Sequence, residues 1–149
     1  MTTPNYLIGE SNDKAERMYL QASDTWSPDE HGWNLAIILK LDEGDNVEEV
    51  AYGDASATWV EIYYNCSDVT YALRGDTVFA RDGSQREMNY FQPDELQFKP
   101  VPQQSYLTVA YQAACHVADP SALEQVGPFK IYDLINSDLA RWKQSQAGQ

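Results

Sequence analysis

Alternation of hydrophobic and polar positions is clearest in the middle of the chain. In the segment Thr58–Tyr64, the even-numbered positions after Thr58 are apolar or aromatic and would share one face of a strand. The other face would carry Trp59, Glu61 and Tyr63. Asn34–Leu41 is also apolar and β-branched, and it is too short to favour a helix. Both segments are therefore predicted to be strands.

Further short segments of strand character surround these two, separated by turn-forming residues. Val47–Tyr52 would pair with Asn34–Leu41 across a turn formed by residues 42–46. Pro100 within Leu96–Val101, with Pro102 directly after it, confines that segment to the edge of a sheet. The remaining strands are predicted as a meander over Val69–Leu73, Thr77–Ala80 and Gln85–Phe91, with turns at Arg74–Asp76 and Arg81–Ser84.

Helical spacing occurs near both ends of the chain. The apolar positions within 15–22 fall at i, i+3, i+4 and i+7, with Asp13 as N-cap and Glu16 as its capping-box partner. Ser105–Ala118 has near-helical spacing, although residues 105–111 leave strand and helix both open. Asp119 and Pro120 are typical of the start of a short helix ending at Gly127. Phe129–Gln144 has the longest amphipathic stripe and is the best-defined helix.

These elements predict an α+β fold. We expect an antiparallel sheet of about five to seven strands, with two or three helices packed on one face. The length of 149 residues fits one domain, with frayed ends at about residues 1–6 and 145–149. The longest purely apolar run has four residues, far below the roughly 20 that a membrane-spanning helix needs.

Charge is the strongest chemical signal in the sequence. The chain has 23 acidic against 10 basic residues, a formal net charge of −13. Residues 24–68 hold eleven of these acids and one base, whereas residues 101–149 hold four acids and three bases. Direct binding to nucleic acid or to an anionic membrane needs a basic surface, so neither is expected. The acidity suits solubility, a basic protein partner or the imitation of a polyanion.

No known catalytic motif is present. His31 lies in a polar loop beside Asp29, but two potential ligands do not define a metal site. Neighbours such as Cys115 and His116 point apart on a helix or strand, so they cannot act as a nucleophile and base together. Arg74–Asp76 matches an integrin-binding tripeptide by chance. We therefore expect no catalytic residues, no metal and no cofactor.

Two cysteines, Cys66 and Cys115, are too few for a disulfide framework or a zinc site. The first residues have neither a basic segment nor an apolar one, unlike a secretory signal. We therefore expect a cytoplasmic protein in which both thiols are unpaired and partly buried, although a bridge between them stays geometrically possible.

The sequence favours a non-catalytic binding module. Its acidic face would occlude the basic surface of a partner, such as a nuclease or DNA-processing complex, in the manner of bacterial or phage inhibitors, immunity proteins and DNA mimics. The chain itself would be a monomer or dimer. The expected contact residues are the acidic hairpin with one aromatic anchor: Asp42, Glu43, Asp45, Glu48, Glu49, Asp54 and Trp59.

Two other functions remain open. The first is a small enzyme or ligand-binding domain, because curved sheets often hold a pocket under a helix. Tyr63, Tyr71 and His116 are candidates to line such a pocket. The second is a structural subunit of a virion or another multi-protein assembly, which short edge strands would serve.

Overall fold

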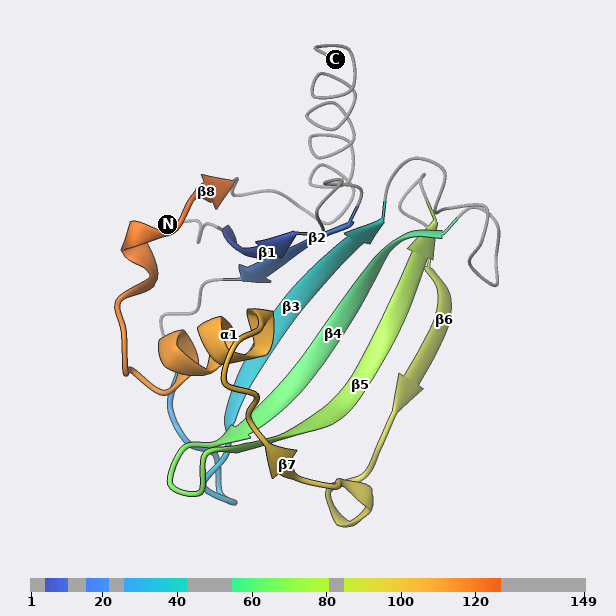
Figure 1. The fold of residues 1–149 in the computed structure, drawn as a ribbon. Helices are drawn as coiled ribbons and strands as arrows, with labels where there is room; N and C mark the ends of the chain where they lie inside the picture. Colours follow the sequence, from blue (N-terminus) through green and yellow to red (C-terminus); the bar gives the residue numbers. More distant parts are fainter. Residues whose placement is uncertain (1–4, 11–15, 22–25, 43–54, 81–84, 127–149) are drawn as a thin grey trace.

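The computed structural model of the chain describes residues 5–10, 16–21, 26–42, 55–80 and 85–126 (Figure 1). Within these residues, eight antiparallel strands form one strongly twisted sheet. Most neighbours in the sheet are also consecutive in the chain, in the order β6-β5-β4-β3-β2-β1-β8. The strands are β1 (Asn5–Glu10), β2 (Glu16–Gln21), β3 (Asn34–Asp42), β4 (Ala55–Asn65), β5 (Thr70–Ala80), β6 (Gln85–Tyr90), β7 (Lys99–Pro100) and β8 (Gln125–Val126).

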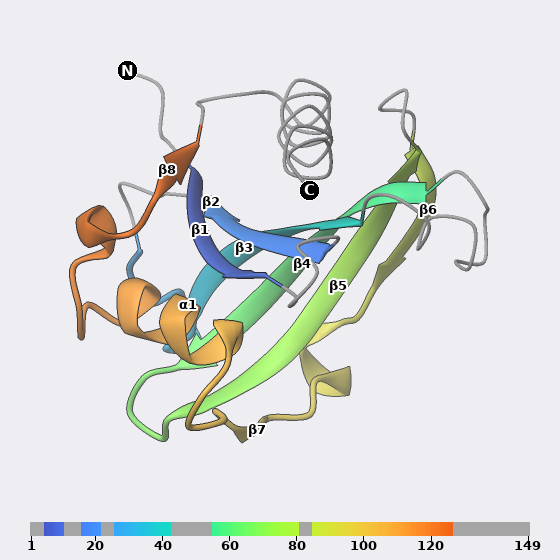
Figure 2. The same ribbon diagram turned by 45° about the horizontal axis from the view of Figure 1, so that its top comes forward.

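One α-helix, α1 (Tyr106–Ala114), lies across one face of the sheet in the described part of the chain (Figures 1 and 2). Ser105 caps its first turn, because the Ser105 hydroxyl accepts a hydrogen bond from the Leu107 N–H. Its buried side chains are all alanines, which let the helix approach the sheet closely. Two single-turn 3-10 helices, η2 (Pro93–Glu95) and η3 (Pro120–Ala122), flank α1 in the sequence.

The sheet has a hydrophobic core on each face. On the face covered by α1, the fully buried side chains include Leu20, Ile38 and Tyr64. On the opposite face, Tyr19, Leu39 and Ala57 are buried, and Leu7, Trp59 and Phe79 pack against them. The alternation within β4 therefore matches its prediction, since Ile62 and Tyr64 belong to one core and Trp59 packs on the other.

The helix predicted over residues 15–22 is wrong. Residues 16–21 form β2, which pairs with β1 on one side and β3 on the other. Residues 17–20 are all buried, so both faces of this strand are covered. A strand buried on both faces has no alternating pattern and resembles a short helix in sequence.

The strands predicted at Val69–Leu73 and Thr77–Ala80 are one strand, β5. Glu61 pairs with Gly75 and Ile62 with Leu73, which leaves Arg74 as the extra residue of a β-bulge. Arg74–Asp76 is therefore the bulged centre of a long strand instead of the predicted turn. Gln85–Phe91 is confirmed as a strand over Gln85–Tyr90.

Two other boundaries differ from the predictions. In the predicted edge strand Leu96–Val101, Lys99 and Pro100 alone pair, with β5. Asn5 and Tyr6 were expected to be frayed, but they lie in β1 and pair with both β2 and β8.

The antiparallel sheet is confirmed, and Tyr106–Ala114 confirms a helix within Ser105–Ala118. Asp119 caps η3, as expected from its position before Pro120, but η3 has only three residues. The predicted strand Val47–Tyr52 and the predicted helix Phe129–Gln144 lie outside the described residues. Within those residues, no helix combines the length and apolar character needed to cross a membrane.

Cys66 and Cys115 form a disulfide, so the expectation of two unpaired thiols is wrong. The bridge joins the end of β4 to the C-terminal end of α1, with 5.7 Å between the two Cα atoms. Disulfides persist mainly in oxidising compartments, so the cysteines give no support to a reducing cytoplasm.

Candidate functional site

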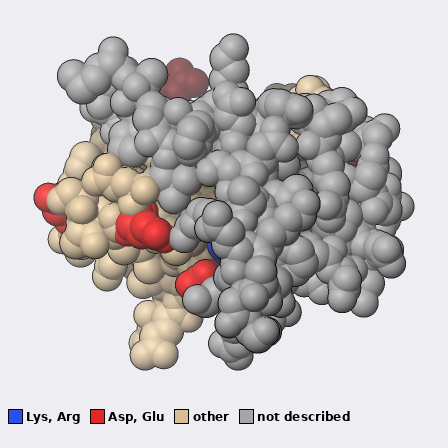
Figure 3. Space-filling model, turned by 90° about the horizontal axis from the view of Figure 1, so that it is seen from above, with Lys and Arg blue, Asp and Glu red and all other residues tan. Residues whose placement is uncertain are grey.

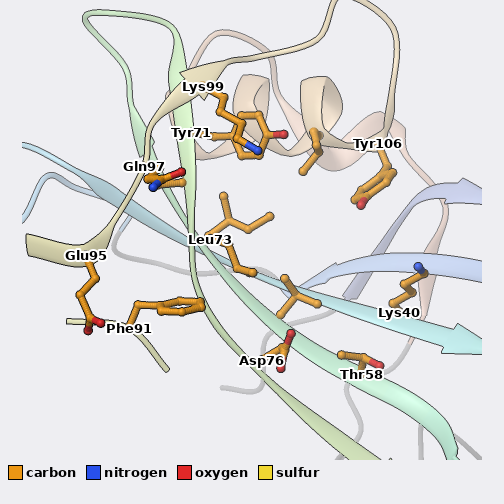
Figure 4. Close-up of a pocket in the computed structure, with 14 residues that line it drawn as sticks. Lys40, Thr58, Tyr71, Leu73, Asp76, Phe91, Glu95, Gln97, Lys99 and Tyr106 are labelled. Atoms are coloured by element: carbon orange, nitrogen blue, oxygen red, sulfur yellow. The ribbon is translucent and has the colours of Figure 1, made fainter. Parts of the chain in front are cut away.

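A pocket of about 720 Å³ lies on the same face of the sheet as α1 (Figure 4). Strands β3, β4 and β5 form its floor, the segment 91–99 forms one wall, and the first turn of α1 forms another. The lining residues are Lys40, Thr58, Val60, Ile62, Tyr71, Ala72, Leu73, Asp76, Phe91, Glu95, Gln97, Lys99, Tyr106 and Leu107.

The floor of the pocket depends on the bulge in β5. Leu73 and Asp76 are three positions apart and would face opposite sides of a regular strand. The extra residue, Arg74, shifts the alternation, so Leu73 and Asp76 both line the pocket. They stand beside Ile62 and Val60 of β4, their register partners.

The wall formed by residues 91–99 is tied to β5 at two points. The Phe91 N–H donates to the Arg74 carbonyl at 2.9 Å, and the Val101 N–H donates to the Val69 carbonyl at 3.1 Å. Between these points, a carboxylate oxygen of Glu95 accepts a hydrogen bond from the Gln92 N–H at 2.7 Å. This contact closes the turn η2 and occupies one oxygen of the Glu95 carboxylate.

Tyr64 of β4 fixes the helical wall of the pocket to the sheet. Its hydroxyl donates a hydrogen bond to the Leu107 carbonyl at 2.8 Å. Burial raises the pKa of Tyr64 far above the ordinary range of a phenol, because the phenolate would be desolvated. At the other end of α1, the Asn34 amide donates to the Ala114 carbonyl at 2.8 Å. The first turn of α1 is therefore fixed relative to the floor.

Several polar groups at the pocket have no protein partner among the described residues. Lys99 makes no ion pair there, and the hydroxyls of Tyr71 and Tyr106 make no hydrogen bond there. The Asp76 carboxylate has one long contact, from the Asn89 amide at 3.4 Å. These groups are chemically available to a ligand in the pocket.

Of the three residues suggested for a pocket, Tyr71 alone lines this one. Tyr63 lies on the opposite face of β4, where its ring packs against Trp33 with 5.3 Å between centroids. The ring of His116 contacts the Trp26 carbonyl through Nε2. Sequence reasoning missed Lys99 and Phe91, because nothing in a polar edge segment indicates which face it covers.

The predicted acidic contact surface falls mostly outside the described residues. Asp42 ends β3, and Glu43, Asp45, Glu48, Glu49 and Asp54 lie outside the described part. Trp59 is half-buried and packs against the core on the sheet face opposite α1. Its indole N–H donates a hydrogen bond to the Glu61 carboxylate at 3.2 Å. In Figure 3, the acidic side chains of the described residues stand apart from one another on the face shown.

A polar cluster on the sheet face opposite the pocket centres on Glu61. Its carboxylate accepts hydrogen bonds from Arg74 and from the hydroxyl of Tyr90, the latter at 2.8 Å. The guanidinium of Arg74 lies 5.8 Å from the ring centroids of both Tyr63 and Tyr90. The pKa of Tyr90 is raised, mainly because its hydroxyl is partly desolvated and to a smaller extent because it contacts Glu61. The hydrogen bond with Thr77 lowers this pKa and offsets part of the increase. The two charged groups of this cluster, Glu61 and Arg74, form an ion pair with each other.

The conformation of the loop around His31 is stabilised by contacts within the loop itself. One Asp29 oxygen accepts hydrogen bonds from the backbone N–H groups of His31 and Trp33, at 2.8 and 3.0 Å. The ring of His31 stacks on that of Trp33, with 4.5 Å between centroids. Among the described residues, no group of three or more metal-binding side chains occurs.

Comparison with known proteins gives no relative: no family model, no curated protein and no solved structure matches the chain.

Proposed function

We propose that the chain is a non-catalytic binding protein that holds a small amphipathic molecule in the pocket beside α1. The observation that supports this most is the pocket itself. Its volume of about 720 Å³ lies within the range typical of small-molecule sites, roughly 300 to 1,000 Å³. Such sites combine an apolar surface with a few polar groups that orient the ligand.

The lining residues match this combination. Val60, Ile62 and Leu73 are apolar lining residues of the floor. Leu73 lies in the middle of the view, with lysine, carboxylate and phenol groups around it (Figure 4). The polar side chains of this lining, such as Lys99, Tyr71 and Asp76, suit the binding and orientation of a ligand. A ligand bound here would cover Leu73 and Phe91, which are 40% and 45% exposed.

The test is to block the floor and measure the binding of an apolar dye. Nile red is a neutral probe whose emission rises in apolar surroundings. We expect it to bind the native chain, and Leu73→Trp to weaken this binding by filling the pocket. Met88→Trp is a matched control, because Met88 is 59% exposed and does not line the pocket. Equal binding by both variants would show that the dye site lies elsewhere.

The charge of the chain favours a second candidate function, the occlusion of a basic protein surface. Eleven acids within residues 24–68 would attract a cationic partner and speed its association. In this candidate, residues of the segment 42–54 would make the contacts.

The second candidate is tested with two variants of equal net charge. One carries Glu43→Lys, Asp45→Lys and Glu48→Lys, and the other carries Glu124→Lys, Asp133→Lys and Asp138→Lys. A native extract is passed over each immobilised protein and over the wild type, with low-salt and then high-salt washes. We expect the first variant alone to lose a basic nucleic-acid enzyme that the wild type retains at low salt. Equal retention by both variants would contradict a role for the segment 42–54.

A further inference from the structure

We propose that the pocket binds an amphipathic carboxylic acid, with its carboxylate at Lys99 and its apolar tail over Leu73. This inference rests on the proposed ligand-binding function and adds the chemical class and orientation of the ligand. It depends on which polar groups at the pocket are already engaged by the protein and which are not.

Lys99 is the cation at one end of the pocket. Its side chain is exposed and reaches over the hollow from β7 (Figure 4). Within the described part of the chain it makes no ion pair. The acidic side chain that lines the pocket on the same wall is Glu95, and one of its carboxylate oxygens accepts a hydrogen bond from the Gln92 N–H. The ammonium of Lys99 is therefore available to an anionic group of a ligand.

A second donor stands next to Lys99. Tyr71 is its direct partner across the β5–β7 pairing, and directly paired residues have Cβ atoms about 5 Å apart. The ring of Tyr71 is positioned by packing on Tyr64, with 6.5 Å between centroids. Its hydroxyl makes no hydrogen bond among the described residues. An ammonium and a phenol O–H together suit a carboxylate, which has two oxygens that accept hydrogen bonds.

The apolar tail has a defined path from this end. Leu73 lies in the middle of the floor, and Asp76 and Thr58 lie beyond it (Figure 4). At about 3.3 Å per residue, the five steps of β5 from Tyr71 to Asp76 span at most roughly 16 Å. Because Leu73 is 40% exposed, a tail laid over it would remove apolar surface from water. The polar residues at the far end favour a tail of medium length.

The overall acidity of the chain does not oppose this assignment. At physiological ionic strength, charges farther away than about 8 Å are largely screened, so the nearest groups determine which head group binds. An amine head group at this end would meet the ammonium of Lys99. A carboxylate there would meet two donors.

The test compares three probes with the same ten-carbon tail: decanoate, decanol and decylamine. Affinities are measured by isothermal titration calorimetry on the wild type, on Lys99→Met, and on Lys143→Met, a control that removes one lysine charge elsewhere in the sequence. We expect decanoate to bind most tightly and decylamine least tightly. Lys99→Met should weaken decanoate binding about tenfold, the size of one charge-assisted hydrogen bond, and leave decanol unchanged. Lys99→Arg should retain most of the decanoate affinity.

Each other result has a distinct meaning. If decanoate and decanol bind equally and Lys99→Met changes neither, the carboxylate assignment is wrong and the ligand-binding function stands. Tighter binding of decylamine would overturn the assignment in the same way. If none of the three probes binds and Nile red does not bind either, the inference and the proposed function both fail.

Discussion

Single polar residues connect distant parts of this fold. Tyr64 of β4 and Asn34 of β3 both donate to carbonyl groups of α1, one near each end of the helix. Both side chains belong to residues that are almost fully buried. Buried polar groups are costly unless they are hydrogen-bonded, so these contacts define where the helix lies on the sheet.

Tyr64 makes the stability of the protein sensitive to alkaline pH. Its pKa is raised in the folded state, so the folded chain holds the phenol proton more tightly than the unfolded chain does. The resulting stability is fully present below the unfolded pKa of about 10 and declines as pH rises above it. We expect Tyr64→Phe to lower the free energy of unfolding by about 1 kcal/mol at neutral pH, because one hydrogen bond is lost.

When the pH is raised from neutral to above about 10, the free energy of unfolding should fall less in Tyr64→Phe than in the wild type. The variant lacks the phenol whose raised pKa causes the alkaline loss of stability. Urea unfolding curves across this range measure the difference. An identical alkaline decline in both proteins would show that Tyr64 is not the responsible group.

Gly75 illustrates a steric requirement within a strand. A Cβ atom at this position would lie 2.3 Å from Cδ1 of Tyr90 and 2.5 Å from the Asn89 carbonyl oxygen. Both atoms belong to β6, and one of them is backbone, so the clash cannot be relieved by a side-chain rotation alone. We expect Gly75→Ala to destabilise the protein by about 1 to 3 kcal/mol, as overpacking does. Thermal unfolding measures this, with Tyr90→Phe as a control that keeps the ring.

At the scale of elements, the pocket depends on how α1 and the segment 91–99 are attached to the sheet. The helix is attached through its buried alanines, two hydrogen bonds from the sheet and the Cys66–Cys115 disulfide. The segment 91–99 is attached to β5 by backbone hydrogen bonds near its two ends, from Phe91 to Arg74 and from Val101 to Val69. The bulge at Arg74 then turns the correct side chains of β5 toward the space between them.

The disulfide should contribute measurably to stability. It joins residues 49 positions apart, and closing a loop of this length restricts the unfolded chain. We expect Cys66→Ser with Cys115→Ser to lower the free energy of unfolding by about 2 to 4 kcal/mol. The measurement is urea unfolding with and without a thiol reductant. Reductant should destabilise the wild type and leave the double variant unchanged, and equal sensitivity of the two would contradict the bridge.

At the scale of the whole molecule, the net charge of −13 opposes compaction. Like charges repel more strongly in the folded chain than in the expanded one, and added salt screens the repulsion. In the described part, some acids are offset locally: Glu61 contacts Arg74, and Asp119 accepts a hydrogen bond from the Ser121 N–H, which lowers the pKa of that carboxyl.

We therefore expect sodium chloride to raise the melting temperature between low and physiological ionic strength. The effect should be smaller in a variant that replaces Glu43, Asp45 and Glu48 with glutamine, because its net charge is less negative. Differential scanning calorimetry at a fixed pH measures both. A melting temperature that falls with salt in the wild type would contradict net self-repulsion.

The sequence by itself determined the elements that carry a clear local pattern of residue types. Asn34–Leu41, the centre of β4 and Gln85–Tyr90 were recognisable as strands, whereas Ser105–Ala118 had near-helical spacing that left strand and helix both open over residues 105–111. These patterns are local, because the spacing of residue types and the turn-forming residues between segments can be read without knowing which distant segment packs on them. The excess of acidic residues was equally readable without a structure.

The tertiary structure alone decided the features that depend on contacts between distant residues. β2 is buried on both faces, so its strand state follows from pairing with β1 and β3. The turn expected at Arg74–Asp76 became a bulge because both halves of β5 pair with the one long strand β4. Pairing of Cys66 with Cys115 and the meeting of Lys99, Tyr71 and Leu73 at one pocket likewise require the packed sheet and helix. The physical reason is that burial and long-range pairing are properties of the assembled chain, and no local pattern encodes which distant segment covers a given face.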